Sequence, residues 1–363
     1  MKTFDERAAP ESVWKKLLRN KAGVSGLLII ILSFFIAVFA YVIAPDRSVN
    51  ANTIIVELAA RKPMHQQKFI VLPSASPLPK QSIVDQWLFG KKENEKWIPI
   101  QSWKQLNNTI IAEKWVDDGL TETISINLNG TSAEDLIKTK TFLLGTDKFG
   151  RDMLSRLIIG IRVSLGVGCI AVIISLTVGV FFGAAAGYFG GRTDRIIMWL
   201  INVVWSIPTL LLVFAFTLAL GKGFWQVFIA VGLTLWVNVA RLVRGQVMSI
   251  RTLNYIEAAT AMGFSDLRII IRHVLPNIIG PILVIAASNF ATAIVLEAGL
   301  SFLGIGVQPP QPSWGLMMKE NYNFIITNNP ALALAPGIAI MLLVLSFNLL
   351  GNGLRDAVDV RGE

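Results

Sequence analysis

The residue types that usually carry chemistry are scarce in this chain and are not clustered. Its 363 residues include two histidines and one cysteine, and His65, Cys169 and His273 lie far apart in the sequence. Metal sites need several histidine, cysteine or carboxylate ligands at short spacings, and the sequence has no such group. His65 is therefore interpreted as a solvated loop residue. The phosphate-binding pattern G-x-x-x-x-G-K-[ST] is also absent, so we expect a protein that is not an enzyme and holds no cofactor.

One acidic residue, Glu297, lies within an apolar run. Ionisable groups are costly inside a membrane span and often mark functional sites. Glu297 either hydrogen-bonds to the glycine-rich backbone that follows it, or lines a substrate path or an outer gate. A gradient-driven carrier usually holds several such groups, so a single carboxylate argues against that class. Transport against a gradient would then take its energy from another polypeptide.

A polar stretch, EAATAMGFSDLRIIIRHVLP, interrupts the apolar runs, and its first half predicts a helix. We expect Thr252 to cap a helix over residues 253–262, because its hydroxyl can satisfy a free N–H of the first turn. Ala258 and Ala259 favour helix and leave a low surface that another protein can approach closely. Gly263 lies where the helix should stop, since glycine readily adopts the left-handed conformation of a C-terminal cap.

The second half of the stretch predicts another helix on the same surface. Ser265 is expected to cap it, and Asp266 in its first turn is favoured by the helix dipole. An apolar stripe is expected at Leu267, Ile270, Ile271 and Val274. This stripe could pack on the protein's own spans or on a partner. Pro276 is expected to end the helix just before the next span.

Long apolar runs must position these segments, and they predict a membrane protein. Hydrophobic residues make up 53% of the chain, charged residues make up 16%, and the mean hydropathy is +0.57. A helix needs about 20 mostly apolar residues to cross a bilayer. We therefore expect an all-α polytopic membrane protein with six transmembrane helices. The six runs are residues 24–44, 163–187, 196–220, 224–240, 278–303 and 331–350.

Lysine and arginine are distributed unequally between the short loops, and cytoplasmic loops carry the excess. Six precede the first run, two follow the second, five lie between residues 241 and 272, and two lie in the C-terminal tail. The two short loops on the other side carry one each. Both ends and the polar stretch are therefore predicted to be cytoplasmic. The net charge of +9 is then largely a topology signal and requires no nucleic-acid partner.

Two segments outside the spans have a distinct character. Residues 46–142 are polar and contain strand-like alternation, as in the string TISINL, which predicts a small α+β insertion on the extracytoplasmic side. Ahead of the first run, residues 11–21 place Trp14, Leu17 and Leu18 on one face, with basic residues around the rest. This pattern indicates either a helix in the cytoplasmic interface or a plain basic flank.

The polar stretch resembles the cytoplasmic EAA loop of ABC importer permeases. His273 replaces the isoleucine of the general pattern, but the string IRHVLPN is similar to the variant of the dipeptide/oligopeptide subfamily. Four further strings also resemble this subfamily: LGTDKFGRDMLSRLIIGIRVSL, GYFGGRTDR, LEAGLSFLGIGVQPPQPSWG and the C-terminal FNLLGNGLRDAVD. The matching loop residues are Glu257, Ala258, Ala259, Gly263, Leu275 and Pro276.

The resemblance implies the type I ABC importer permease fold and a set of partners. These are a second related permease in a heterodimer, two cytoplasmic ABC ATPases that bind the ATP, an extracytoplasmic solute-binding protein and a peptide substrate. In such transporters the EAA loop, here about residues 245–277, docks on an ATPase. Glu257 would make a polar contact, Ala258, Ala259 and Gly263 would allow close approach, and Leu275 with Pro276 would link the loop to the fifth span.

The string TDKFGRD contributes Asp147, Arg151 and Asp152 as candidate pathway or gate residues. The resemblance implies a position near the external gate or the binding protein, although the segment could equally be an interfacial helix that places the second span. Alternatives for the whole system are import of nickel chelates, glutathione or antimicrobial peptides, or a stand-alone gradient-driven carrier.

The expected organisation follows from these assignments. The segments are a cytoplasmic tail at residues 1–23, the first span at 24–45, the extracytoplasmic insertion at 46–142, the outer-face motif at 143–161, the transmembrane domain at 162–354 and a cytoplasmic tail at 355–363.

Overall fold

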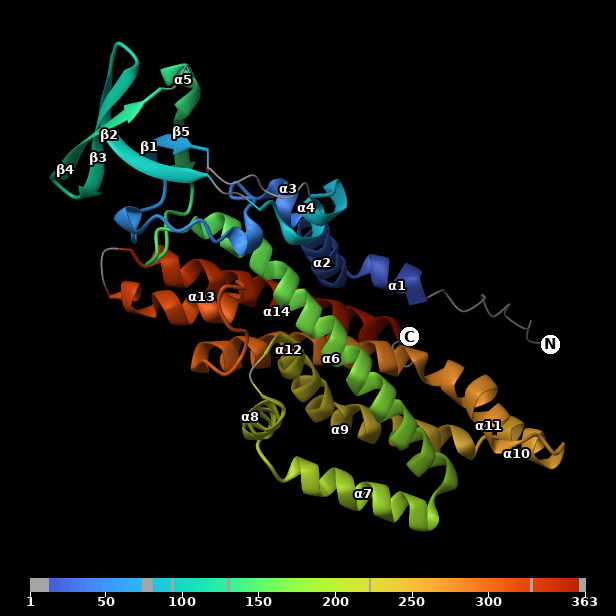
Figure 1. Ribbon diagram of the computed structural model, residues 1–363. Coiled ribbons are helices and arrows are strands. Elements are labelled where there is room, and N and C mark those ends of the chain that lie inside the picture. The colour runs from blue at the N-terminus through green and yellow to red at the C-terminus, as the bar shows by residue number, and fades with distance from the viewer. Residues whose placement is uncertain are drawn as a thin grey trace. The chain divides into compact units, whose positions relative to one another are not determined.

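The computed structural model describes residues 13–73, 81–92, 95–128, 131–221, 223–326 and 329–358. The chain divides into two compact units, and Figure 1 shows their helices and strands. The helical unit comprises residues 1–34, 165–300 and 340–363, and the mixed unit comprises residues 35–164 and 301–339. The first part of the predicted N-terminal tail, residues 1–12, and the tail residues 359–363 lie outside the described residues.

The longer helices belong wholly or partly to the helical unit. In chain order they are α1 (Val13–Arg19), α2 (Lys21–Val38), α6 (Met153–Phe189), α7 (Gly191–Trp205), α8 (Thr209–Leu220), α9 (Phe224–Arg251), α10 (Asn254–Ala261), α11 (Asp266–Ile269), α12 (Ile279–Leu303) and α14 (Ala331–Val358). A π-helical turn, η3 (Ile270–Val274), and a 3₁₀ turn, η4 (Leu275–Ile278), join α11 to α12.

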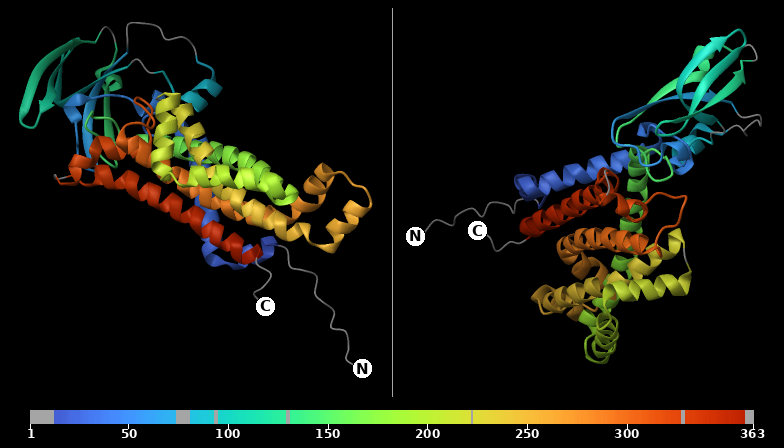
Figure 2. Two further views of the ribbon diagram at one scale, coloured as in Figure 1. Left: turned by 90° about the horizontal axis from the view of Figure 1, so that it is seen from below. Right: turned by 90° about the vertical axis from the view of Figure 1, so that its left-hand side faces the viewer.

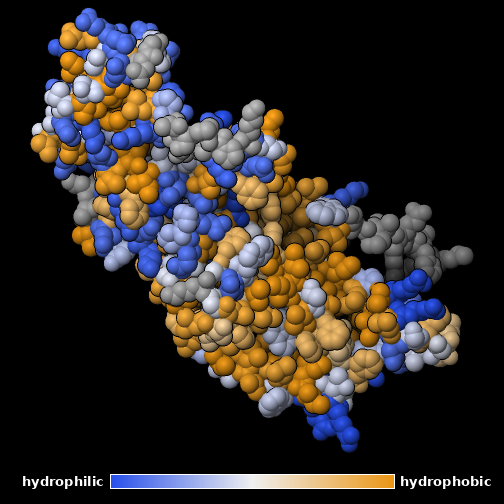
Figure 3. All heavy atoms as spheres, in the orientation of Figure 1, coloured by the Kyte–Doolittle hydropathy of each residue, from blue (hydrophilic) through white to orange (hydrophobic). Residues whose placement is uncertain are grey.

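Within the described residues, five helical segments are long and apolar enough to cross a membrane. They are α2, α6, α9, the helical path Asp266–Leu303 and α14, and a sixth crossing results if α7 and α8 form one span. The prediction of a predominantly helical polytopic membrane protein is therefore confirmed. Figure 3 shows hydrophobic residues over much of the visible surface of the helices, as expected for side chains in contact with lipid.

The third predicted span, residues 196–220, is not one straight helix. α7 and α8 form an angle of 91°, and Figure 1 shows α8 nearly end-on while α7 lies across the view. The break lies at Ser206, Ile207 and Pro208. Proline has no N–H to donate and disfavours helical backbone at the residue before it, so the chain bends here. The apolar run continues through the break, so its length does not reveal the bend, and Pro208 is the local signal for it.

α6 packs closely against α9 through a row of glycines. Gly179, Gly183 and Gly187 recur every fourth residue and so share one face of α6. A Cβ on Gly183 would lie 2.6 Å from the Ala240 carbonyl oxygen and 2.8 Å from the Val243 Cβ. Small residues at such spacing let two helix backbones approach each other inside a membrane, where dispersion contacts replace the hydrophobic effect as the driving force.

The mixed unit contains a five-stranded antiparallel sheet in the order β4-β3-β2-β1-β5 (Figure 2). The strands are β1 (His65–Leu72), β2 (Lys96–Leu106), β3 (Thr109–Asp117), β4 (Leu120–Asn127) and β5 (Ile137–Phe142). The other elements are α3 (Ala40–Ile43), η1 (Val49–Ala51), η2 (Val56–Leu58), α4 (Ile83–Phe89), α5 (Ala133–Leu136), α13 (Trp314–Asn321) and η5 (Tyr322–Ile325).

Both faces of this sheet bury apolar side chains next to β1. Ile70 packs on one face with Ile98 and Ile110, and Phe69 packs on the other with Leu58 and Phe142. Neighbouring residues of a strand point to opposite faces, so a continuous apolar segment such as FIVL can serve two cores. The predicted α+β character of the insertion is borne out by this sheet and its short helices, whereas its extracytoplasmic position stays a prediction.

Candidate functional site

The EAA-like stretch folds into a helical hairpin that Figure 2 shows protruding at one end of the helical unit. Its first helix is α10, but Thr252 does not cap it. Thr252 belongs to the end of α9, where its Oγ1 donates a hydrogen bond to the Ser249 carbonyl oxygen at 3.0 Å. Leu253 takes the N-cap position with extended backbone and no side-chain bond. The predicted cap was therefore wrong by one residue, because α9 extends further than its apolar run.

Gly263 forms the corner of the hairpin as predicted. Its φ of +81° lies in the left-handed region, which glycine adopts at little cost. Its N–H donates to the Thr260 carbonyl oxygen at 2.9 Å, and the Phe264 N–H donates to the Ala259 carbonyl oxygen at 3.2 Å. These two bonds form a Schellman motif. No atom lies within 4 Å of a Cβ built on Gly263, so backbone conformation and not space requires glycine here.

The second helix differs from the prediction in its register. Ser265 takes the N-cap position but makes no side-chain cap bond, and α11 gives way to the π-helical turn at Ile270. Ile269 and Val274 are fully buried, whereas Leu267 and Ile271 are 67% and 53% exposed. The predicted stripe assumed 3.6 residues per turn, but a π-turn bonds residues five apart and shifts which side chains face inward.

Pro276 does not end the helix before the fifth span. It lies in η4, and the helical path continues from Asp266 to Leu303. Proline cannot donate to the carbonyl four residues earlier and its ring would clash with that carbonyl. The wider π-turn just before it and the 3₁₀ turn around it give the backbone the altered geometry that accommodates the ring. The second helix of the hairpin and the span are thus one continuous helical path.

The predicted coupling residues divide into exposed and inward-facing ones. Glu257, Ala258, Gly263 and Pro276 are exposed, and Leu275 is half-buried. Ala259 is only 2% exposed and packs in the apolar core that also holds Val243 and Val247 of α9. Its small side chain therefore lets α10 approach its own unit, and the expectation that it serves a partner's approach was wrong for this residue. The exposed residues of the hairpin include Glu257, Ala258, Gly263, Leu267 and Ile271.

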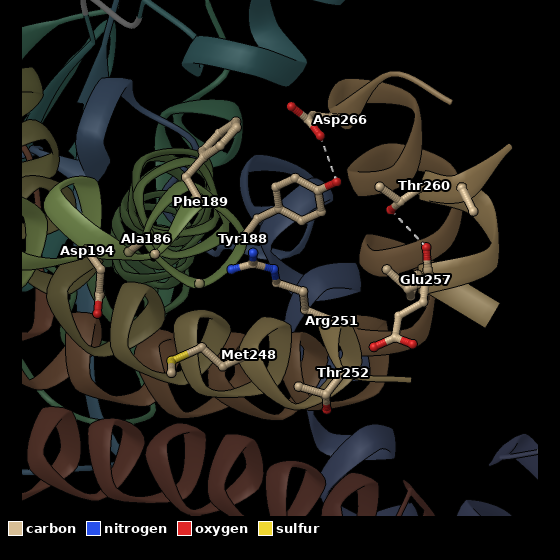
Figure 4. A pocket seen from close by; sticks show the side chains of 14 residues that line it. Ala186, Tyr188, Phe189, Asp194, Met248, Arg251, Thr252, Glu257, Thr260 and Asp266 are labelled. Carbon is tan, nitrogen blue, oxygen red and sulfur yellow. Dashed lines mark hydrogen bonds between the residues drawn. The ribbon is translucent and has the colours of Figure 1, made fainter. Parts of the chain in front are cut away.

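An open pocket of about 890 Å³ lies beside the hairpin (Figure 4). Its walls come from the end of α6, the start of α7, the end of α9 and α10. The Tyr188 hydroxyl at the end of α6 donates a hydrogen bond to Asp266 Oδ1 at 2.9 Å, and Figure 4 shows the two side chains pointing toward each other. Arg251 lies with its guanidinium 5.8 Å from the Tyr188 ring centroid. Glu257 is part of the same wall.

One ion pair involves a residue of the pocket wall, Asp194. Arg244 of α9 forms a two-pronged pair with Asp194 of α7, with an Nη2–Oδ2 distance of 2.7 Å. Such bidentate pairs fix geometry as well as charge. The sequence analysis gave Tyr188 and Asp194 no role, and it gave Asp266 only a role in the first turn of its own helix. Their contacts tie the hairpin and α7 to the ends of two long helices.

Asp147 and Arg151 lie in a buried cluster in the mixed unit. Arg151 Nε is 2.6 Å from Asp147 Oδ2, and Arg151 Nη2 is 2.7 Å from Glu320 Oε2. Arg156 is also buried there, with its Nε 3.7 Å from Asp147 Oδ2. Sequence reasoning missed Arg156 and Glu320, since Glu320 is distant in the chain and follows the PSWG string by a few residues. Charges so enclosed need partners, and the cluster pairs Arg151 closely, whereas the Arg156 nitrogens have only long ion-pair contacts and no hydrogen-bond partner among the described residues.

Asp152 has a separate, local role at the start of α6. Its Oδ1 accepts a hydrogen bond from the Leu154 N–H at 3.3 Å, and its Oδ2 accepts one from the Ser155 hydroxyl at 2.6 Å. This is an N-cap arrangement. Burial raises the pKa of the Asp152 carboxyl above its ordinary value, and the bond from Ser155 partly opposes that shift. The geometry agrees with the alternative that this segment places the second span.

Glu297 lies in α12 and is fully buried within the chain. Its role in a pathway or gate stays a prediction. The side chain is not accessible from the surface of this chain, so its position gives that role no support. In the described part of the chain, no group of three or more histidine, cysteine, aspartate or glutamate side chains could hold a metal ion.

Comparison with known proteins identifies the family. Residues 179–361 match the family described as binding-protein-dependent transport system inner membrane component. The chain belongs to this family of transport permeases. Residues 11–59 of the permease also match the N-terminal TM domain of oligopeptide transport permease C. Most of the sheet-bearing insertion lies between these two matches and is therefore outside both.

The permease is similar to several curated proteins. It is 42% identical to the glutathione transport system permease protein GsiD of Pectobacterium atrosepticum over 60% of this chain and 71% of that protein. It is 38% identical to the oligopeptide transport system permease protein OppC of Bacillus subtilis over 61% and 72%. It is 42% identical to the dipeptide transport system permease protein DppC of Alkalihalophilus pseudofirmus over 65% and 75%.

Among solved structures, the permease is similar to an inward-facing MetNI methionine ABC transporter. The TM-score is 0.48 at 19% identity, over 57% of this chain and 98% of that chain.

Proposed function

We propose that this chain is the permease subunit of an ATP-driven importer of dipeptides and oligopeptides, and that it forms half of the translocation pathway. Relatives whose names specify oligopeptide, dipeptide and glutathione transport support this substrate class. The chain itself is not catalytic in this proposal, and the ATP is hydrolysed by two cytoplasmic ATPase subunits. A second related permease and an extracytoplasmic solute-binding protein complete the complex in the bacterial inner membrane, with both termini of this chain in the cytoplasm.

The continuous helical path from the hairpin into α12 carries the proposal. An ATPase that binds the exposed face of α10 would move Gly263 and α11, and the path Asp266–Leu303 would pass this movement into the membrane. Glu257 is the exposed charged residue next to the pocket and is our candidate for the polar contact with the ATPase. Ala258 and Gly263 leave room for close approach, while Leu275 and Pro276 lie where the hairpin joins the span.

The hydrogen bond between Tyr188 and Asp266 attaches the hairpin to a second long helix. It joins α11 to the end of α6, so movement of the hairpin would reach two spans instead of one. α7 would follow as well, because Arg244 of α9 holds Asp194. A bidentate pair of this kind keeps its partners in register during a rigid-body movement.

Co-purification tests the proposal. The chain is expressed with its second permease and its two ATPases, and Glu257→Lys is compared with Glu122→Lys, a charge reversal at another exposed glutamate, on β4. We expect Glu257→Lys to reduce the recovered ATPase and the ATP-dependent uptake, and Glu122→Lys to leave both unchanged. Uptake by vesicles that contain this chain alone, without ATP, would contradict the proposal.

Glutathione is the second candidate solute, because the GsiD relative is as similar as the dipeptide relative. A competition assay for uptake distinguishes peptides from glutathione as the solute. Uptake of a labelled dipeptide that unlabelled oligopeptides inhibit, but glutathione does not, would support the peptide assignment. The reverse result would replace it with glutathione.

A further inference from the structure

The insertion carries a basic groove, and the lysines described in its walls lie outside both family matches. Two open pockets of about 930 and 350 Å³ lie in the mixed unit and share Thr53, Lys91, Glu95 and Trp97 in their walls. Volumes of this order are typical of sites for small molecules and short chain segments. Among the residues that the structure describes, six basic ones line the combined groove: Arg47, Lys91, Lys92, Lys96, Lys138 and Lys140.

The acidic residues of the groove do not balance these charges. Asp46 is 4% exposed, and its carboxylate accepts hydrogen bonds from the Ser48 N–H at 2.9 Å and the Thr53 hydroxyl at 3.2 Å. Glu57 forms an ion pair with Lys114 at 3.1 Å, and Lys114 does not line the groove. Glu95 is the remaining carboxylate among the lining residues that the structure describes. These described residues therefore present an excess of positive charge to an incoming ligand.

The sheet positions two of the lysines beside an aromatic wall. Lys138 and Lys140 are two residues apart on β5 and so point to the same face. Their Nζ atoms lie 5.8 and 5.9 Å from the Trp97 ring centroid. Trp97 in turn packs edge-on against Phe69, at 5.4 Å between centroids. The backbone register, with Phe69 opposite Lys138 and Val71 opposite Trp97, fixes this arrangement across three strands.

We propose that this groove binds acidic peptide chain. Lys138 and Lys140 would contact carboxylates, and Trp97 would pack against the aliphatic part of the same residues. Charge-assisted bonds from ammonium to carboxylate are about twice as strong as neutral ones, and the ring excludes water on one side. Within the described residues, neither lysine forms an ion pair with a carboxylate of the chain itself, and Lys140 acts on the buried Asp152 carboxylate only through its longer-range charge. This site is independent of the coupling hairpin.

Binding of a fluorescein-labelled tetraglutamate to the full transporter in nanodiscs tests the site. We expect tetraglutamate to bind and tetraglutamine not to bind. The double variant Lys138→Glu/Lys140→Glu should bind tetraglutamate at least about tenfold more weakly, as expected for the loss of charge-assisted contacts. Raising the salt from about 0.05 to 0.3 M should weaken binding to the wild type, because salt screens exposed charges.

Two further variants serve as controls for the binding measurement. Lys104→Glu makes the same charge reversal on β2, seven residues and about 23 Å along the strand from Trp97, and should bind as the wild type does. Lys138→Gln/Lys140→Gln removes the charges without reversing them, and should show a smaller loss with an unchanged melting temperature. Equal binding by the wild type and both double variants would overturn the site. So would displacement of tetraglutamate by phosphatidylglycerol vesicles but not by unlabelled tetraglutamate.

Uptake assays distinguish a free peptide from an acidic segment of a protein partner. If the groove receives free peptide, the double charge reversal lowers uptake of acidic peptides and spares neutral ones. If it receives an acidic segment of the solute-binding protein, uptake of both falls together. Unchanged uptake of both would overturn either assignment. Absence of any peptide uptake by the wild type would count against the proposed transport function, while the tetraglutamate measurement would still judge the groove.

Discussion

Replacing Gly183 with alanine tests whether close backbone contact holds α6 against α9. The new Cβ would lie 2.6 Å from the Ala240 carbonyl oxygen, 2.8 Å from the Val243 Cβ and 3.0 Å from the Ala240 Cα. Two of these three atoms belong to the backbone, which cannot rotate away as a side chain could. The two helices must therefore separate locally, or the methyl group must remain compressed.

The expected magnitude combines two opposing effects. Overpacking a well-packed contact costs about 1–3 kcal/mol, and exchange of glycine for alanine within a helix recovers about 1 kcal/mol. Gly183→Ala should therefore lower the free energy of unfolding by up to about 2 kcal/mol. Gly166 lies on the same helix, and no atom lies within 4 Å of a Cβ built there. Gly166→Ala should keep the helix gain alone and raise stability by about 1 kcal/mol.

Unfolding of the purified chain in mixed micelles, followed by tryptophan fluorescence, measures the difference. We expect the melting temperature of Gly183→Ala to fall and that of Gly166→Ala to stay level or rise. The contrast matters more than either value, because both variants change the same residue type in the same helix. Equal shifts for the two variants would refute the argument that the α6–α9 contact requires glycine at position 183.

Variants at three positions test the hairpin, the buried cluster and the cap of α6. Gly263→Ala must place a side chain at φ +81°, which costs about 1–2 kcal/mol, and Gly263→Asn should lose less; thermal melting compares them. Arg151→Met leaves Asp147 and Glu320 with fewer partners and should cost about 3–5 kcal/mol, measured by chemical unfolding. Asp152→Ala should cost about 1 kcal/mol through loss of the cap, whereas Asp152→Asn should cost less. Because burial raises the pKa of Asp152, the folded state holds its proton more firmly, and this contribution to stability is lost as pH rises through the folded pKa. The melting temperature of the wild type relative to Asp152→Asn should therefore fall with rising pH in the mildly acidic range; a constant difference would contradict the assignment.

The coupling hairpin shows how far local sequence reasoning reaches. Gly263 was predicted correctly, because a left-handed corner depends on the backbone of that residue and its neighbours alone. The cap at Thr252 and the stripe from Leu267 to Val274 were predicted wrongly. Both depend on where the neighbouring helices end and wind, namely the extension of α9 to Arg251 and the π-turn ahead of Pro276.

The candidate gate residues show the same limit at longer range. Asp147 and Arg151 were selected because they are charged and lie in a motif. Their environment depends on Glu320, which is far away in the chain and joins them only after folding. No spacing in the sequence marks such a partner, since the contact arises from tertiary packing.

The sequence by itself determined the class of this protein, its membrane-spanning runs and the glycine corner of its hairpin. Each of these follows from composition, from an apolar run of bilayer length or from the conformational freedom of one residue. Only the tertiary structure decided that the third run bends by 91°, that Ala259 faces inward, and that Lys138 and Lys140 flank Trp97. Pro208 signals a break in the third run but not its angle. The other two features depend on which segments meet in space, and pairing between distant segments leaves no periodic signal in the chain.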